Sequence, residues 1–114
     1  RDNPAILSGA EYLTQPNNMI HYAEEDERDT RNIYAWYMTS MFLKQLGPTN
    51  EYWRKWNKSL CQEIPQHQEP QTSDEAGSWS PINDLYGFSG GRLYTTVLSI
   101  LCLEVYYRHL AIYR

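Results

Sequence analysis

The spacing of apolar residues between positions 89 and 110 constrains the fold most strongly. These residues recur at helical intervals and fill more than one face of a helix; they are Leu93, Val97, Ile100, Leu101, Leu103 and Leu110. A helix that is apolar on several faces is enclosed by its neighbours. We therefore predict a helix from about Ser89 to Leu110 that other parts of the protein cover on most sides.

Two further helices are predicted in the first half of the chain. Asn3 is a good N-cap, and Pro4 fits a first helical position, where its missing N–H costs nothing. This helix ends at Gln15-Pro16. A second helix starts at Thr30, another N-cap candidate, and ends at Gly47-Pro48, where glycine can adopt the left-handed cap conformation and proline cannot continue the helix.

A fourth segment with helical spacing opens at Thr49 or Asn50 and stops at Pro65. Its apolar stripe consists of Trp53, Trp56, Leu60 and Ile64. A long polar connection over 66–90 joins it to the last helix. The pattern predicts one all-α domain over 1–114, built as two helical hairpins.

The two halves resemble a repeat. Tyr37-Met38-Thr39 and Tyr94-Thr95-Thr96 share a Tyr-x-Thr pattern with an offset of 57 residues. We expect one repeat over about 1–47 and a second over about 48–114, each an outer amphipathic helix followed by a more apolar inner helix. Repeat arrays usually need three or more units to bury their shared core. Two repeats therefore predict that inner-helix residues such as Leu93, Val97 and Ile100 are covered by a partner, through self-association or through packing against the rest of a longer chain.

Composition excludes several classes of function. The net charge of −4 argues against a nucleic-acid binder held by phosphate contacts. The most apolar run, 93–107, is shorter than the roughly 20 residues of a spanning helix and contains Glu104. Cys61 and Cys102 sit inside helical patterns, which favours free thiols over a disulfide. No signal fixes a compartment. Because the chain opens at Arg1 rather than Met, a trimmed or excised piece is one possibility.

A family resemblance comes from the second half of the chain. Residues 71–79 read QTSDEAGSW and match the Gln-x(2–5)-Gly-x-Trp signature of squalene and oxidosqualene cyclases; they are followed by GGRLYTT at 90–96 and LCLEVYYR at 101–108. Over about 70–110 the chain resembles the last repeats of bacterial prenyltransferase and squalene-oxidase repeat proteins, in the terpenoid-cyclase and protein-prenyltransferase superfamily. The resemblance implies a segment of an α/α toroid, whose inner helices line a central cavity.

The signature residues Gln71, Gly77 and Trp79 also have a physical interpretation of their own. Gly77 permits close approach of the backbone, Trp79 can stack on a helix end, and the Gln71 amide can bond free backbone groups there. The resemblance implies that this motif is a structural clamp between outer helices.

The chemistry of the superfamily is not visible in these residues. Its cyclases protonate their substrate with an Asp-x-Asp-Asp string, which the sequence lacks, and its prenyltransferases hold zinc with an Asp and a Cys two residues apart, which neither cysteine matches. The acidic runs 24–27 and 74–75 fit solvated connections. We predict no catalytic residue, no metal ligand and no cofactor.

Five residues are candidates for contact with a ligand: Trp36, Tyr37, Arg92, Tyr94 and Glu104. Aromatic side chains facing a cavity could hold an isoprenoid through apolar and cation–π contact, although aromatic stripes are more often plain core. Glu104 has Arg108 four residues on, the favourable orientation for a helical ion pair, and a catalytic acid is the alternative.

Three functions follow as hypotheses. The preferred one is a non-catalytic helical-repeat module, the C-terminal portion of a longer toroid-type protein, which acts through packing or partner binding. The alternatives are the C-terminal part of an isoprenoid cyclase or prenyltransferase whose catalytic residues lie outside this chain, and a small lipid-binding protein that completes its toroid by self-association. In the latter two, an isoprenoid or another apolar molecule would be the ligand.

Overall fold

The computed structural model describes residues 3–22 and 31–113, with side chains placed up to Arg108. Its helices are α1 (Pro4–Leu13), the short 3-10 helix η1 (Pro16–Asn18), α2 (Ile33–Lys44), α3 (Glu51–Gln66) and α4 (Gly87–Tyr113). Within these residues no β-strand forms, and Arg31 and Asp84 make an isolated β-bridge. The predicted all-α class is confirmed.

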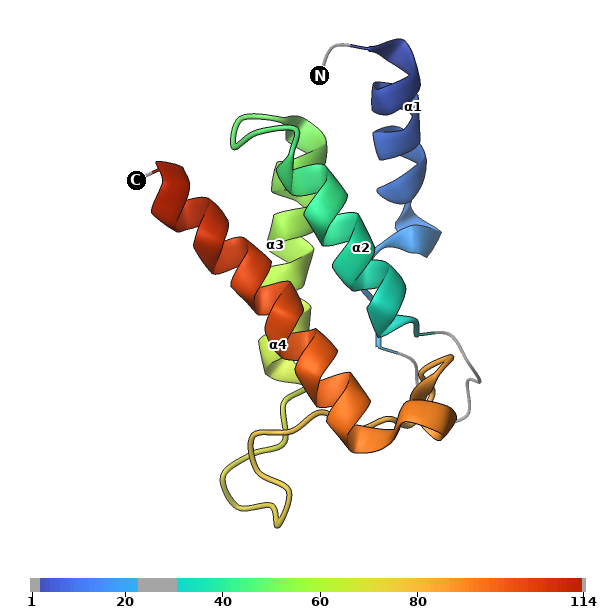
Figure 1. Cartoon of the computed structure of the whole chain (residues 1–114), viewed down its shortest axis with the longest axis vertical. Helices are drawn as coiled ribbons and strands as arrows, with labels where there is room; N and C mark the ends of the chain where they lie inside the picture. Colours follow the sequence, from blue (N-terminus) through green and yellow to red (C-terminus); the bar gives the residue numbers. More distant parts are fainter. Residues whose placement is uncertain (1–2, 23–30, 114) are drawn as a thin grey trace.

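The helices form a thin, two-layered arrangement (Figure 1). α2 and α4 lie side by side and run in the same direction, while α3 lies behind them and runs the opposite way. α1 also runs opposite to α2. The molecule measures 46 × 31 × 20 Å, and its shortest dimension matches two helix layers packed about 8–10 Å apart. α3 therefore backs the α2–α4 layer on one side only.

Asparagine caps start three of the helices. Asn3 accepts a hydrogen bond from the Ala5 N–H at 2.8 Å, as the sequence predicts. Asn50 accepts one from the Tyr52 N–H at 2.8 Å, so of the two predicted starts, Thr49 and Asn50, the cap is Asn50. α2 begins later than expected. Its N-cap is Asn32, whose side chain accepts from the Ala35 N–H at 3.0 Å. The predicted cap Thr30 lies outside the described residues.

Two predicted boundaries around the long connection are wrong. α3 includes Pro65 and ends at Gln66, because a proline in the last turn forfeits only its own N–H bond. α4 begins at Gly87, so the connection covers 67–86 rather than 66–90. Gly91 has φ 69° and ψ −169°, a conformation open essentially to glycine alone, and it separates a first turn from the rest of α4.

The core lies where α2, α3 and α4 meet. Its largest fully buried side chains are Ile33, Leu43, Trp53, Trp56, Leu60, Ile64 and Cys102. The Trp56 indole N–H donates to Ser40 Oγ at 2.9 Å, and the Ser40 hydroxyl donates to the Trp36 carbonyl at 2.8 Å. The predicted stripe of α3 is therefore buried along its whole length, and the indole N–H of Trp56 is hydrogen-bonded within it.

The predicted enclosure of α4 holds for only part of its surface. α2 and α3 contact it along two sides. Leu93, Val97 and Ile100, which the sequence predicts to be covered by a partner, are exposed in the single chain. No element among the described residues lies over this side of α4.

Candidate functional site

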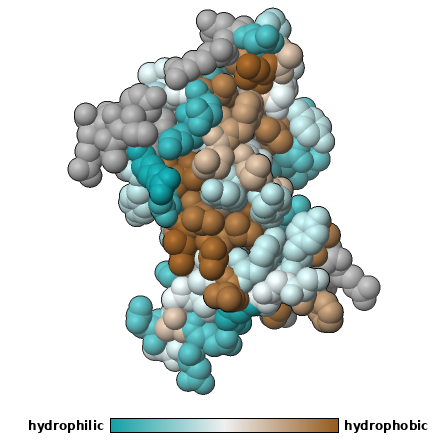
Figure 2. All heavy atoms as spheres, viewed as in Figure 1, coloured by the Kyte–Doolittle hydropathy of each residue, from teal (hydrophilic) through white to brown (hydrophobic). Residues whose placement is uncertain are grey.

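The α2–α4 layer presents an apolar surface on the side away from α3. Its exposed apolar side chains come from one stripe on each helix: Tyr34, Met38 and Met41 on α2, and Leu93, Val97, Ile100 and Tyr107 on α4. We call these seven residues the open face. Figure 2 shows hydrophobic side chains gathered along the middle of the molecule in this view, over α4 and its neighbour. Leu93 is 77% exposed and Ile100 is 50% exposed.

Helical geometry explains why both helices have two apolar sides. On α2 the open-face residues are spaced by four and then three positions, and on α4 by four, three and seven, so each set lies on one side of its helix. The core-facing residues of the same helices lie on the opposite side; they are Trp36, Ser40 and Leu43 on α2, and Leu98, Cys102 and Val105 on α4. Each of these two helices therefore has one covered side and one uncovered apolar side.

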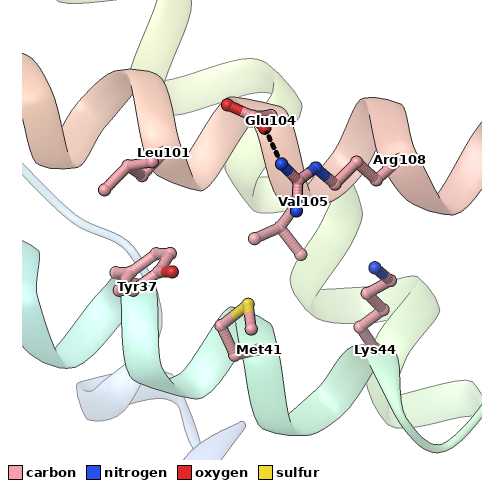
Figure 3. A pocket seen from close by; sticks show the side chains of 7 residues that line it. All are labelled: Tyr37, Met41, Lys44, Leu101, Glu104, Val105 and Arg108. Atoms are coloured by element: carbon pink, nitrogen blue, oxygen red, sulfur yellow. Dashed lines mark ion pairs between the residues drawn. The ribbon is translucent and has the colours of Figure 1, made fainter.

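A shallow groove of about 170 Å³ runs between α2 and α4 (Figure 3). It is lined by Tyr37, Met41, Lys44, Leu101, Glu104, Val105 and Arg108. Tyr37 and Met41 face Leu101 and Val105 across the groove. Glu104 and Arg108 form an ion pair at the rim, which confirms the predicted helical pair.

A larger hollow of about 380 Å³ lies between the end of α3 and the middle of α4. It is lined by Pro65, Gln68, Trp79, Ile100, Leu103, Glu104 and Tyr107. Ile100 and Tyr107 belong to the open face as well, so this hollow is continuous with the apolar surface. Its shape and lining suit an apolar group rather than a charged one.

The Gly-x-Trp residues link α3 to α4. The Trp79 indole N–H donates to the Ile64 carbonyl in the last turn of α3, at 2.8 Å. The Trp79 backbone is held on α4 by two hydroxyls: its N–H donates to Thr96 Oγ1 at 3.1 Å, and its carbonyl accepts from Thr95 Oγ1 at 2.7 Å. Gly77 has φ 88°, which places the turn in the left-handed region that favours glycine. Gly77 and Trp79 thus belong to a clamp between helix ends.

The other proposed clamp residue, Gln71, is exposed in the connection. The amide of Gln68 makes a hydrogen bond within the connection instead, donating to the Gly77 carbonyl at 2.9 Å. Arg92 also belongs to this clamp. Its guanidinium lies 2.5 Å from the Glu75 carboxylate and 2.9 Å from Ser78 Oγ. Arg92 therefore holds the connection against the start of α4.

The structure separates the five residues predicted to contact a ligand. Trp36 is only 6% exposed and lies edge-on to Tyr22 with ring centroids 5.3 Å apart, on the core side of α2. Tyr94 is half-buried, its ring lies beside Gly90, and burial raises the pKa of its hydroxyl. Only Tyr37 and Glu104 share a groove.

Sequence reasoning missed the junction between Arg31 and Asp84. The buried Asp84 carboxylate accepts from the Ile33 N–H at 2.8 Å and from the Tyr86 N–H at 3.0 Å, so it caps α2 and orders the turn before α4. Arg31 donates to the Ser80 carbonyl at 3.1 Å and lies over the Tyr22 ring. Burial lowers the pKa of Arg31, and the neighbouring Tyr22 and Asp84 oppose that change. An Asp side chain can accept a hydrogen bond from the backbone N–H two residues later, and this pattern is a local signal for a turn that could have identified this one.

Other kinds of site can be surveyed over the same residues. In 3–22 and 31–113 no three His, Cys, Asp or Glu side chains gather closely enough to hold a metal ion. Cys61 and Cys102 are free thiols, as predicted. None of the helices in this part of the chain is both long and apolar enough to cross a membrane.

Comparison with known proteins adds no relative. No family model, no curated protein and no solved structure matches this chain. The open face, the hollow beside Trp79 and the clamp at 77–79 are therefore the features on which a function is argued.

Proposed function

We propose that this chain is a non-catalytic helical-repeat module that works by binding a protein partner on its open face. One observation carries the proposal: both inner helices expose a continuous apolar stripe on the side away from their core. The largest apolar patch of a typical monomer covers about 300–600 Å², and larger or contiguous patches mark interaction surfaces. From the exposed fractions of its seven residues, the open face covers roughly 600 Å², the upper end of that range. Lys44, Glu104 and Arg108 lie beside it, along the groove between α2 and α4.

The helix directions support the repeat part of the proposal. Parallel helices α2 and α4, with α3 behind them running the opposite way, are the arrangement expected of inner and outer helices in a helical-repeat protein. In a toroid of the kind that the sequence resembles, the uncovered side of the inner helices would face other repeats or the central cavity. The proposal therefore includes packing against further repeats as one form of partner binding.

The chemistry at the face supports binding rather than catalysis. Glu104, the one carboxylate among the residues lining the two hollows, is held by Arg108 on the surface of α4. Its place at the edge of the open face suits a role in orienting a partner.

Photo-cross-linking in the cells that make the protein tests the proposal. Ile100→benzoylphenylalanine places a reactive group in the middle of the open face, and Lys58→benzoylphenylalanine places the same group on an exposed part of α3 as a matched control. We expect protein adducts from position 100 that position 58 does not give. Equal adducts from both positions, or none from position 100, would show that the open face takes no partner.

Binding of an apolar small molecule is a second candidate, favoured by the hollow beside Trp79. Its volume of about 380 Å³ falls within the range of small-molecule sites, roughly 300–1,000 Å³. Labelled squalene or farnesyl diphosphate should then bind saturably, and Leu103→Glu should abolish binding. A linear, unsaturable signal from both compounds would exclude this candidate.

A further inference from the structure

We propose that the partner of the open face is a second copy of this chain, docked face to face about a two-fold axis near Ile100, with the two α4 helices antiparallel. This inference rests on the proposed function, because it names the partner that the open face takes. Three observations carry it: the area of the face, the symmetry of its stripe and the position of its charges.

The area of the open face matches the requirement of a small dimer. At about 150–200 Å² for a large side chain, the exposed parts of its seven residues amount to roughly 600 Å² on one copy. Two copies would then bury about 1,200 Å² in total, the lower end of the range for specific protein interfaces. A second copy is thus large enough to cover the whole face.

Among the open-face residues of α4, all but Val97 are placed symmetrically about Ile100. Leu93 and Tyr107 lie seven positions before and after it, and all three side chains are exposed. A two-fold axis across α4 at Ile100 therefore sets Leu93 of one copy opposite Tyr107 of the other, and Ile100 opposite itself. Because α2 runs parallel to α4 in the same layer, the same axis brings the α2 stripes of the two copies together. Such an interface is isologous and closed, so it ends at two copies.

Charge selects the antiparallel arrangement over the parallel one. Parallel α4 helices would set Glu104 against Glu104 of the second copy and Arg108 against Arg108. In the antiparallel pair the two Glu104 residues lie eight helical positions apart, about 12 Å along the axis, which is beyond the screening length of physiological salt. The opposed helix dipoles are also favourable in this arrangement.

Sedimentation measures the assembly directly. The purified chain should change from monomer to dimer between about 1 and 100 µM, the range in which a modest interface associates. Ile100→Glu and Leu93→Glu should each remain monomeric with an unchanged helical circular dichroism signal, while Lys58→Glu on α3 should dimerise normally. A wild-type chain that stays monomeric throughout, or face variants that still dimerise, would overturn the inference.

Disulfide trapping tests the geometry. In a Cys61→Ser background, Ile100→Cys should give a covalent dimer on mild oxidation, because the axis brings position 100 next to its own image. Leu93→Cys should not, since its image lies 14 helical positions away, about 21 Å, and a disulfide spans at most about 7 Å between Cα atoms. A parallel dimer would link both variants and would contradict the antiparallel axis.

The two proposals fail separately. If the photo-cross-links from position 100 contain a different protein and the purified chain is monomeric, the inferred self-association is wrong and partner binding on the open face stands. If position 100 gives no adduct at all in cells, both are wrong.

Discussion

At the scale of single residues, burial decides chemistry in this protein. Cys102 is fully buried between the helices, and removal from water raises the pKa of its thiol to about 12. Cys61 is half-buried, lies 3.7 Å from Asn57 Oδ1, and has a pKa raised by burial. The two thiols therefore differ mainly in accessibility and in how far each resists ionisation.

The raised pKa of Cys102 predicts a loss of stability in alkali. The folded thiol keeps its proton up to about pH 12, whereas an unfolded cysteine loses it near pH 8.5, so the unfolded state binds fewer protons between these values. The contribution of the buried Cys102 thiol to the free energy of unfolding is fully present below about pH 8.5 and declines as the pH rises above it. Urea unfolding of the wild type and of Cys102→Ala between about pH 8 and pH 10 checks this. We expect the free energy of unfolding to fall less with rising pH in Cys102→Ala than in the wild type. An equal fall in the two proteins would contradict the raised pKa of Cys102.

Asp84 predicts a stability effect far from the open face. Replacing it with Ala leaves the Ile33 and Tyr86 N–H groups without their carboxylate acceptor, at a position that is 3% exposed. We expect Asp84→Ala to lower the free energy of unfolding by about 2 kcal/mol. Asp84→Asn keeps one oxygen acceptor and should lose less. Urea titration followed by circular dichroism measures both, and an equal loss in the two variants would mean that charge matters more than the hydrogen bonds.

At the scale of elements, local signals set the helix starts, while tertiary contacts set how α2 and α4 correspond. The Tyr-x-Thr pattern equates positions 57 apart, which pairs the buried Trp36 with the exposed Leu93. Burial instead matches positions 62 apart: Trp36 with Leu98, Ser40 with Cys102, and Leu43 with Val105. The predicted repeat register is therefore wrong, because a three-residue pattern does not specify which side of a helix meets the core.

The break in α4 predicts opposite effects for two glycines. Gly91 has φ 69° and ψ −169°, so Gly91→Ala should lower the free energy of unfolding by about 1–3 kcal/mol although no atom lies within 4 Å of the added methyl. Gly9 lies inside α1, also in open space, and Gly9→Ala should raise stability by about 0.5–1 kcal/mol. Thermal unfolding of the two variants makes the comparison. A neutral Gly91→Ala would mean that α4 runs continuously from Gly87.

At the scale of the whole molecule, the chain buries one side of the α2–α4 layer and leaves the other open. A thickness of 20 Å leaves room for α3 behind the layer and for no third layer in front of it. The exposed stripe costs little in the isolated chain, because scattered apolar exposure is common on folded proteins. The exposed apolar surface is contiguous over two neighbouring helices, and the proposed partner binding rests on this contiguity.

Coupling between folding and dimerisation gives a prediction at this scale. Because only folded chains form the dimer, dimerisation stabilises the folded state. The unfolding midpoint of the wild type should therefore rise with protein concentration. Leu93→Gln should remove that dependence and change the low-concentration stability by less than about 0.5 kcal/mol, since the side chain is already 77% exposed. Ile64→Val, a core change, should lower stability by about 1 kcal/mol at every concentration and keep the dependence. Thermal unfolding at several concentrations distinguishes these outcomes.

Local sequence patterns predicted much of the fold but only part of the candidate site. The N-caps at Asn3 and Asn50 and the stripe of α3 depend on residues within a few positions of each other, so pattern alone identified them. The junction of Arg31 with Asp84 joins residues 53 positions apart and could not be read locally. Trp36 and Tyr37 are adjacent aromatics with the same sequence signal, yet one faces the core and the other the groove.

The sequence by itself determined that this protein is helical, where α1 and α3 begin, and that Gly77 and Trp79 occupy a turn between helix ends. It did so because helix capping, apolar spacing and glycine conformation act over one or two turns of chain. Only the tertiary structure decided which apolar side of α2 and α4 is covered. Both sides satisfy the same hydrophobic pattern, and the choice depends on where α3 packs; the side that α3 leaves uncovered is the open face.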